Sequence, residues 1–325
     1  MNIQIIGGGS WGLALANLLA GAGRRVRLWC READQPETLR ATRYSPYYLP
    51  DVPLHESIEV ASDVDPEADM AVYAVPSHAM RGAVRQLPFS GGAIRVSVAK
   101  GIENKSLLRM SEVIEEEAGE CPIAALSGPS HAEEVAAGCP ASVVVASTDH
   151  AVAAKVQQAF VTPRFRVYTT TDLPGVELGG SLKNVIAIAA GACDGFGLGD
   201  SAKAALITRG LAEMARLGDA MGANPLTFSG LSGMGDLIVT CTSGFSRNRA
   251  LGERVAAGEN PETIQRESHM VAEGVRTTKS AHNLAIKHNV DMPVTEQVYR
   301  VLFEGANPHD AVEELMLREA KPERG

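Results

Sequence analysis

A single lysine in an otherwise uncharged stretch is the clearest candidate for acid–base chemistry. Residues 178–192 are apolar or small apart from Lys183 and the Asn184 that follows it. Burying an unpaired ammonium group is costly, so we expect Lys183 to face a polar cleft or a charged partner. Burial also lowers the pKa of a lysine towards the range useful for proton transfer. The alternative is a lysine whose ammonium group reaches past apolar surface into water.

A glycine-rich segment, residues 229–236, supplies a candidate partner for this lysine. The segment ends in Asp236, and Ser246 further along has the type and position of a helix N-cap. Arg247 and Asn248 would then open a helix. Free N–H groups at a helix N-terminus, combined with a guanidinium, make a good phosphate receptor. The spacing alone also fits an ordinary first-turn arginine.

The N-terminal segment carries a glycine pattern typical of dinucleotide-binding proteins. Residues 3–6 have the length of a strand, and G-x-G-x-x-G follows at Gly7, Gly9 and Gly12, before a helix-like pattern. The first glycine permits a tight turn, the second admits a pyrophosphate, and the third lets the helix pack against the strand. The helix N-terminus then presents N–H groups to the phosphates. We therefore expect a dinucleotide to bind here.

The end of the second expected strand bears on which dinucleotide binds. It reads Trp29-Cys30-Arg31-Glu32. An acidic residue at this place usually binds the ribose 2′-hydroxyl of NAD, whereas an arginine accepts the 2′-phosphate of NADP. Arg31 leads us to expect that NADP is favoured, and Glu32 keeps NAD possible. The alternative is that Arg31 is a solvated surface charge.

Three further strand-length runs end in short turns, at residues 76–78, 99–101 and 127–131. Ligands of an open parallel sheet bind beyond the carboxyl ends of its strands. Lys100 is therefore a candidate contact for an anion or a carbonyl group. His78 and His131 are possible acid–base groups, but neither has an obvious carboxylate nearby in sequence to orient it. We favour a structural role for both histidines.

The elements that must position these residues alternate between strand-like and helix-like patterns in the first half. Strand-length runs lie at residues 3–6, 26–29, 70–75, 94–98, 123–126, 142–146 and 166–169. Most lack polar alternation, which is typical of parallel strands buried on both faces. After about residue 178 the patterns are helical, at residues 178–192, 202–221, 247–257, 277–287, 295–303 and 308–320. We predict an α/β fold in which a Rossmann-type doubly wound parallel sheet (residues 1–178) precedes an all-helical substrate-binding domain (residues 179–325).

Composition limits the partners and the compartment. The chain has 325 residues, 45% hydrophobic and 21% charged, which is ordinary globular usage for two domains. A formal net charge of −9 argues against a nucleic-acid partner. Five scattered cysteines without zinc-ligand spacing predict no metal site and a reducing compartment. The apolar runs fall short of the roughly 20 residues of a membrane span, and no signal-type start is present. We expect a cytoplasmic protein.

Taken together, these motifs resemble the bacterial NAD(P)-dependent glycerol-3-phosphate dehydrogenase family. The matching segments are residues 7–12, 75–78, 100–103, 127–130, 183–187, 235–237, 246–249 and 271–274, and the likeness runs from about residue 3 to residue 315. The resemblance implies a Rossmann domain followed by a helical domain. It also implies reversible hydride transfer between NAD(P)H and dihydroxyacetone phosphate, which supplies glycerol 3-phosphate for phospholipid synthesis. A homodimer is plausible for this plan.

The resemblance further implies residue roles. Lys183 would accept the proton in alcohol oxidation, Asp236 would orient it, and Lys100 would polarise the carbonyl. The implied substrate contacts are Lys100, Gly128, Ser130, Lys183, Asn184, Asp236, Thr240, Ser246, Arg247 and Asn248. The implied cofactor contacts are Gly7, Gly9, Ser10, Trp11, Gly12, Arg31, Lys100, Ala132, Arg247, Val271 and Glu273. Two departures are Gly8, where alanine is common, and His131, where phenylalanine often stands.

Two other functions remain open on the sequence. A β-hydroxyacid or 6-phosphogluconate-type dehydrogenase shares the two-domain plan, although residues 246–249 and the context of Asp236 argue against it. A non-catalytic NADP-binding sensor would need the glycine loop. It would have no need of Lys183 and Asp236 in a shared cleft.

Overall fold

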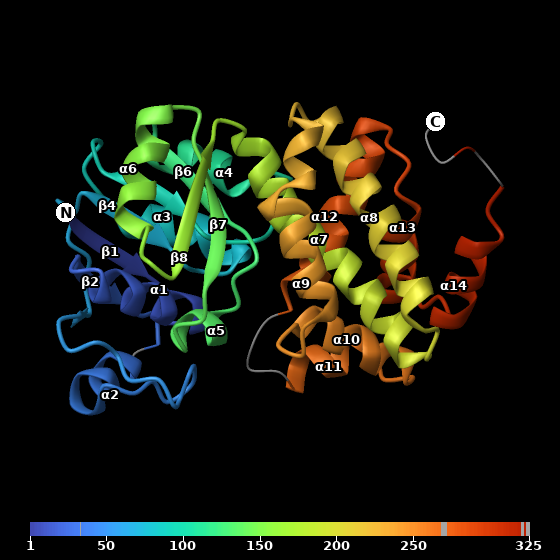
Figure 1. Cartoon of the computed structure of the whole chain (residues 1–325), viewed down its shortest axis with the longest axis horizontal. Helices are drawn as coiled ribbons and strands as arrows, with labels where there is room; N and C mark the ends of the chain where they lie inside the picture. The colour runs from blue at the N-terminus through green and yellow to red at the C-terminus, as the bar shows by residue number, and fades with distance from the viewer. Residues whose placement is uncertain (33, 268–271, 320–321, 323–325) are drawn as a thin grey trace.

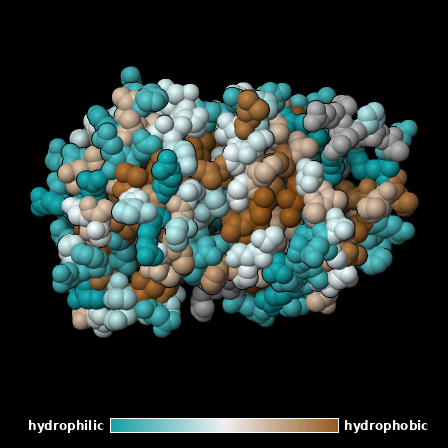
Figure 2. Space-filling view, in the orientation of Figure 1, coloured by the Kyte–Doolittle hydropathy of each residue, from teal (hydrophilic) through white to brown (hydrophobic). Residues whose placement is uncertain are grey.

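Two lobes lie side by side in the computed structural model, which describes residues 1–32, 34–267, 272–319 and 322. The first lobe combines a sheet with helices, and the second lobe has helices but no strand among its described residues (Figure 1). Figure 2 shows apolar surface gathered on one face of the helical lobe, where this lobe adjoins the sheet lobe. The predicted change from strand-like to helix-like patterns after about residue 178 therefore corresponds to the change from the sheet lobe to the helical lobe.

Eight strands of the described chain form one sheet in the order β3-β2-β1-β4-β5-β6-β7-β8. They are β1 (Asn2–Ile6), β2 (Arg25–Trp29), β3 (Glu59–Ala61), β4 (Met70–Tyr73), β5 (Ile94–Ser97), β6 (Ile123–Ser127), β7 (Ala141–Ala146) and β8 (Phe165–Thr170). Strands β1 to β6 run parallel to one another. The order in which the chain adds strands reverses between β1 and β4, because β2 and β3 lie on one side of β1 and β4 to β6 lie on the other. This confirms the predicted Rossmann-type sheet. Ligands of such sheets bind beyond the strand ends at this reversal.

The sheet is not parallel throughout, which corrects the expectation of a purely parallel sheet. Strand β7 runs antiparallel to β6, and β8 runs parallel to β7. The link between β6 and β7 contains only the short helix α5 (Ala132–Ala136). An antiparallel neighbour begins at the edge where the preceding strand ends, so this link needs no crossover along the sheet. The chain therefore turns back at the edge where β6 ends, and α5 stays at that edge.

Helices cover both faces of the sheet, as expected for a doubly wound fold. They are α1 (Ser10–Gly21), α2 (Gln35–Thr42), α3 (Met80–Gln86), α4 (Met110–Ala118) and α6 (His150–Phe160). Buried residues of α1 and α6 share one core with Ile3, Ile5 and Val26. Buried residues of α3 and α4 share a second core with Ile6 and Tyr73. The alternate side chains of β1 thus contribute to cores on opposite faces, which explains its apolar run.

The helical lobe is built around one long helix, α7 (Leu173–Gly195). Packed against it are α8 (Asp200–Ala220), α9 (Asp236–Thr242), α10 (Arg247–Ala256), α12 (Glu273–His288) and α13 (Pro293–Phe303). The helix α11 (Pro261–Glu267) packs on α10, and α14 (Pro308–Met316) packs on α13 and α10 (Figure 1). Short turns η2 (Pro225–Ser229) and η3 (Leu231–Gly235) precede α9, and η1 (Ser77–Ala79) follows β4 in the sheet lobe. The proposed division at residue 178 falls within α7.

Helix α7 alone among the described helices has the length and apolarity of a membrane span. However, 89% of its apolar window is buried inside the protein. Its side chains Leu182, Val185 and Ile186 share a core with Met214 of α8 and Leu251 of α10. The apolar composition of α7 is therefore explained by its place at the centre of the helical lobe.

Candidate active site

The carboxyl ends of β1, β4, β5 and β6 meet at one edge of the sheet, and this edge faces α7, α9 and α12 of the helical lobe. Gly180 of α7 lies so close to the end of β6 that an added Cβ would be 2.4 Å from the Ser127 Oγ atom. Ile102, in the loop after β5, is buried in the core of the helical lobe. These close approaches bring the loops after the strands to within reach of Lys183, one turn beyond Gly180.

Three charged groups from three elements form the centre of this site. The Lys183 ammonium group lies 2.7 Å from Oδ1 of Asp236, and the Lys100 ammonium group lies 2.6 Å from Oδ2. Lys183 is 5% exposed and Asp236 is 1% exposed. The structure therefore places the lysine of the apolar helix beside the carboxylate that follows the glycine-rich segment. Lys100, from the loop after β5, completes the cluster.

Burial and charge shift the pKa of both central groups. Burial lowers the pKa of Lys183 to about 8, the attraction of Asp236 opposes this change, and the repulsion of Lys100 adds to it. Burial alone would raise the pKa of Asp236, but Lys100 and Lys183 outweigh it, so the pKa is lowered. Asp236 is therefore ionised near neutral pH, while Lys183 can exist with or without its proton.

Hydrogen bonds hold the cluster in place from both sides. Lys183 donates to the Thr240 Oγ1 atom at 2.5 Å, and this hydroxyl donates to the Asp236 carbonyl at 2.6 Å. Asn184 donates to the Lys100 carbonyl at 3.2 Å and accepts a hydrogen bond from Asn248 at 2.9 Å. The backbone N–H of Gly274 donates to Asn248 at 3.0 Å. Residues of α7, α9, α10 and α12 are thus connected to the loop after β5.

The loop after β6 approaches the same cluster. Lys100 donates to the Gly128 carbonyl at 2.9 Å, and the Ser130 hydroxyl donates to the same oxygen at 3.2 Å. Gly128 has φ +145, and an added Cβ would lie 2.9 Å from the Val143 Cα atom. Only glycine fits this backbone path without strain. Gly128 and Ser130 are therefore positioned beside Lys100 at the edge of the cleft.

Helix α10 begins beside this cleft. Ser246 is its N-cap, because its side chain accepts a hydrogen bond from the Arg249 N–H at 3.3 Å. Arg247 is exposed in the first turn, and Asn248 is buried. The predicted N-cap is thus confirmed. Arg249, in contrast, binds Asp194 with its Nε atom at 2.6 Å.

The glycine loop has the geometry of a dinucleotide cradle. Gly7 has φ +116, and a Cβ added to Gly12 would lie 1.9 Å from the Gly7 carbonyl oxygen. Gly9 is the N-cap of α1 without a side-chain cap, and a Cβ added there would meet no atom within 4 Å. The tight turn, the close helix and the open space before free N–H groups fit the diphosphate of a dinucleotide.

Of the other residues that the resemblance assigned to the cofactor, Ser10, Trp11 and Ala132 lie on α1 and α5, which pack together. Ser10 and Trp11 open α1, and both Trp11 and Ala132 are partly buried against the core of the sheet lobe. Arg31 is exposed and its guanidinium lies 2.7 Å from a Glu32 carboxylate oxygen. Val271 lies outside the described residues.

Glu273 reaches from the helical lobe to the loop after β4. The Ser77 hydroxyl donates to Oε2 of Glu273 at 2.7 Å, and the Ser77 N–H donates to Oε1 at 3.3 Å. This contact places the start of α12 beside the ends of the central strands. Glu273 therefore lies at the boundary between the two lobes.

Comparison with known proteins agrees with this arrangement. Residues 2–153 match the family model described as NAD-dependent glycerol-3-phosphate dehydrogenase N-terminus, and residues 172–313 match the corresponding C-terminus model. The chain belongs to the NAD-dependent glycerol-3-phosphate dehydrogenase family. The family resemblance seen in the sequence motifs is thereby confirmed.

Relatives within the glycerol-3-phosphate dehydrogenase family match over nearly the whole chain. Glycerol-3-phosphate dehydrogenase [NAD(P)+] 2 of Salinibacter ruber is 53% identical and covers 99% of this chain and 96% of its own. The Pelotomaculum thermopropionicum protein named glycerol-3-phosphate dehydrogenase [NAD(P)+] is 52% identical, with 97% and 93% covered. The crystal structure of glycerol-3-phosphate dehydrogenase from Coxiella burnetii superposes with a TM-score of 0.93 at 39% identity, over 98% of this chain and 99% of that one.

The structure shows the surroundings of the two loop histidines, His78 and His131. Burial lowers the pKa of both His78 and His131. The Nε2 atom of His131 is buried without a hydrogen-bond partner in the described part of the chain. Its ring lies against Phe245, with ring centroids 5.9 Å apart. His131 thus contacts the helical lobe, next to the start of α10.

Sequence reasoning missed several residues that support the site. Gln35, at the start of α2, is buried and donates to the Gly8 carbonyl at 2.7 Å, which holds the glycine loop. Glu177 of α7 accepts hydrogen bonds from Ser111 and Arg109 and so fixes α7 to the start of α4. Glu177 lies only six residues before Lys183, and a carboxylate directly before the apolar segment of residues 178–192 was an available signal. Gln35 carried none.

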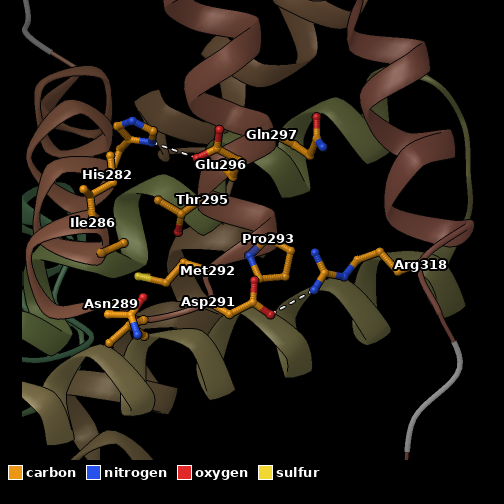
Figure 3. A pocket seen from close by; sticks show the side chains of 12 residues that line it. His282, Ile286, Asn289, Asp291, Met292, Pro293, Thr295, Glu296, Gln297 and Arg318 are labelled. Carbon is orange, nitrogen blue, oxygen red and sulfur yellow. Dashed lines mark hydrogen bonds and ion pairs between the residues drawn. The ribbon is translucent and has the colours of Figure 1, made fainter.

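A pocket of about 480 Å³ lies apart from these residues, in the helical lobe (Figure 3). It is lined by residues of α12, α13 and the segment after α14. His282 and Glu296 pair across it at 2.8 Å, and Arg318 and Asp291 pair at 2.9 Å. No residue assigned to substrate or cofactor lines this pocket. In the described residues, no three His, Cys, Asp or Glu side chains are grouped as metal ligands.

Proposed function

We propose that this protein is an NAD(P)-dependent sn-glycerol-3-phosphate dehydrogenase. It interconverts glycerol 3-phosphate and dihydroxyacetone phosphate. The observation that carries the proposal is the Lys183–Asp236–Lys100 cluster at the strand ends that also bear the dinucleotide loop. The names of the relatives, all glycerol-3-phosphate dehydrogenases, support the same substrate.

The two parts of the chain bind different ligands. Residues 1–178 bind the dinucleotide, chiefly through the loop of Gly7, Gly9 and Gly12 and the start of α1. Residues 179–325 bind most of the substrate. A bound nicotinamide supplies or accepts the hydride at C2 of the substrate.

Lys183 moves the proton that accompanies this hydride. With a pKa of about 8, it is an ammonium group below that pH and donates its proton to the carbonyl oxygen during reduction. Above that pH it is an amine and accepts the proton of the C2 hydroxyl during oxidation. Reduction therefore weakens, and oxidation strengthens, as pH rises through about 8.

Asp236 and Lys100 set the charge around the transferred proton. Asp236 holds Lys183 in place and stabilises its ammonium form, while Lys100 places a second positive charge beside the carbonyl. Thr240 fixes the Lys183 ammonium group from the other side. Asn184 supports both lysines by bonding the Lys100 backbone. A preorganised charge of this kind stabilises the negative oxygen that develops during reduction.

The substrate phosphate binds at the start of α10. Ser246, Arg247 and Asn248 offer a hydroxyl, a guanidinium and an amide beside the N–H groups of that first turn. Gly128 and Ser130 border the opposite side of the substrate. Holding the phosphate aligns C2 with the nicotinamide and so lowers the entropic part of the barrier.

Ser10, Trp11, Ala132 and Glu273 border the dinucleotide together with the glycine loop. We propose Val271, Arg247 and Lys100 as further contacts of the dinucleotide.

The exposed Arg31 supports a preference for NADP, because a 2′-phosphate could replace its present partner Glu32. We expect Arg31→Ala to raise KM for NADPH by about tenfold, with KM for NADH nearly unchanged. Steady-state kinetics with both cofactors measure this. A clear preference for NADH in the unmodified protein would contradict the assignment, as would an unchanged KM for NADPH in the variant.

We propose that the protein acts in the cytoplasm, where it supplies glycerol 3-phosphate for phospholipid synthesis. It acts as a homodimer, without a nucleic-acid partner. Light scattering of the purified protein measures the oligomeric state. A monomer at micromolar concentration would contradict the dimer without affecting the proposed reaction.

The deciding experiment follows NADPH oxidation with a panel of substrates. Dihydroxyacetone phosphate should be reduced rapidly, whereas β-keto acids and the products of 6-phosphogluconate oxidation should not. Turnover of the latter compounds alone would favour the related dehydrogenase class. Cofactor binding without turnover of any compound would favour a sensor.

A further inference from the structure

The turn after β4 contains a buried serine, Ser77, that contacts the helical lobe. Ser77 is 2% exposed and is not among the residues to which the family resemblance assigns a role. Its hydroxyl donates to Oε2 of Glu273 at 2.7 Å, and its N–H donates to Oε1 at 3.3 Å. Hydrogen bonds to a carboxylate are stronger than those between neutral groups. One residue of the sheet lobe therefore holds both carboxylate oxygens at the start of α12.

Gly101, directly after Lys100, packs against this contact. A Cβ added to Gly101 would lie 2.5 Å from the Ser77 Oγ atom and 3.0 Å from Oε2 of Glu273. Side chains do not tolerate a contact of 2.5 Å, so only glycine lets the backbone approach this closely. The backbone next to Lys100 thus lies directly against the hydrogen bond between Ser77 and Glu273.

Hydrogen bonds inside the helical lobe connect the start of α12 to the other side of Lys100. The Gly274 N–H donates to Asn248 at 3.0 Å, and Asn248 donates to Asn184 at 2.9 Å. Asn184 then donates to the Lys100 carbonyl at 3.2 Å. With the packing of the glycine after Lys100, these contacts close a ring across both lobes. The members of this interlobe ring are Ser77, Glu273, Gly274, Asn248, Asn184, Lys100 and Gly101.

The interlobe ring holds the Lys100 backbone from both sides. Ser77, Asn184 and Asn248 are each more than 90% buried, and polar groups in such a network strengthen one another. We propose that Ser77 is a positioning residue for Lys100. Its contacts in the interlobe ring fix the backbone from which the Lys100 ammonium group reaches Asp236, at 2.6 Å. The kinetic consequence rests on the proposed function, whereas the positioning itself does not.

A displaced Lys100 would change the charge around Lys183. Burial lowers the pKa of Lys183 to about 8, the attraction of Asp236 opposes this change, and the repulsion of Lys100 adds to it. The other titratable groups near Lys183 are Cys241 of α9 and His131 in the loop after β6, and neither belongs to the interlobe ring. A loosely held Lys100 repels Lys183 less, so the pKa of Lys183 rises. The pH midpoint of kcat for reduction, which follows the ammonium form of Lys183, then moves upward.

Three variants test this role by kinetics. Ser77→Ala removes the hydroxyl and keeps the N–H, so we expect kcat for reduction of dihydroxyacetone phosphate to fall about three- to tenfold. The pH midpoint of kcat should move upward. Ser77→Cys keeps the size but has a weak donor, so both changes should be smaller and in the same direction. Ser106→Ala is the matched control, because its exposed hydroxyl also donates to a carboxylate, Oε2 of Glu103 at 2.6 Å, outside the interlobe ring. It should change neither kcat nor the midpoint.

Hydrogen exchange measures the positioning without any turnover. Backbone amides of residues 99–104 should exchange faster in Ser77→Ala than in the unmodified protein, while those of α8 should be unchanged. Ser106→Ala should leave exchange at residues 99–101 unchanged. Equal acceleration throughout the protein would mean that Ser77 only stabilises the fold, and this result would overturn the proposal.

The kinetic outcomes that contradict the proposal are distinct from one another. Normal kcat with an unmoved midpoint in Ser77→Ala would exclude a role for Ser77 in placing Lys100. A higher KM for NADPH with an unmoved midpoint would mean that Ser77 acts through Glu273 on the cofactor alone. If the unmodified protein does not reduce dihydroxyacetone phosphate, the proposed function fails, and hydrogen exchange at residues 99–104 still decides whether Ser77 positions this loop.

Discussion

Two carboxylates in the helical lobe are equally hidden from solvent but have opposite surroundings. Asp236 and Glu213 are each 1% exposed. Asp236 lies between the ammonium groups of Lys183 and Lys100. Glu213, on α8, accepts hydrogen bonds from the backbone N–H groups of Val294 and Thr295, at 2.6 and 3.1 Å.

The different partners reverse the effect of burial. Burial raises the pKa of Glu213 to about 7, and the N–H groups at the start of α13 only partly oppose this change. At Asp236 the two ammonium groups outweigh burial, and the pKa is lowered. The full charges of two ammonium groups thus keep Asp236 ionised for chemistry. The dipoles of the backbone N–H groups, in contrast, leave Glu213 close to its neutral form. Glu213 serves to cap α13, whose own N-cap residue makes no side-chain hydrogen bond.

The largest effect should come from removing the lysine partner of Asp236. Lys183→Ala removes the proton donor for reduction, so we expect kcat to fall by about 10²-fold or more. Steady-state reduction of dihydroxyacetone phosphate by NADPH measures this. Lys279→Ala, on the exposed surface of α12, is the matched control and should retain full turnover. Near-normal turnover in Lys183→Ala would remove this lysine from the proton transfer.

A smaller effect should follow when the carboxylate itself loses its charge. Asp236→Asn removes the attraction that raises the pKa of Lys183, so this pKa should fall further below its value of about 8. The ammonium form is then scarcer at neutral pH, and kcat for reduction should fall about tenfold. The pH profile of kcat is the deciding measurement, because its midpoint should move to lower pH by about one unit. A midpoint that stays in place or moves upward would contradict the role of Asp236.

The two carboxylates also differ in how far they could be found from the sequence. Asp236 ends a glycine-rich segment, and Lys183 is the one charge in the apolar run of residues 178–192, so each departs visibly from its surroundings. Glu213 occurs in an amphipathic helix with other polar residues, where its burial against α13 depends on packing that no local pattern encodes. Its neighbours Ala212 and Arg216 carry no information about the distant start of α13.

The same difference, between a local sequence pattern and packing against distant segments, explains which parts of the fold could be predicted. Apolar runs predicted most strands of the sheet, because burial on both faces leaves a local pattern. The direction of β7 could not be read from its run of valines, because an antiparallel strand buried in a sheet has the same composition. The short strand β3 and the hold of Gln35 on the glycine loop likewise depend on contacts between distant segments. The contact between the rings of His131 and Phe245 also joins segments that are distant in the sequence.

The smallest expected effect concerns Glu213, the buried carboxylate that is held by backbone N–H groups. Because the pKa of Glu213 is raised on folding, its contribution to stability is fully present below the unfolded value near 4.5 and is lost as pH rises through about 7. Glu213→Gln stays neutral at every pH and avoids this loss. Between pH 6 and pH 8.5 the variant should therefore gain about 1 kcal/mol relative to the unmodified protein, or roughly 2–4 °C in Tm. Thermal melting at both pH values measures the gain, and Glu304→Gln, an exposed change at the other end of α13, should show none. A Tm difference that is the same at both pH values would mean that Glu213 is ionised throughout, and that helix N–H groups alone suffice to hold a buried carboxylate charged.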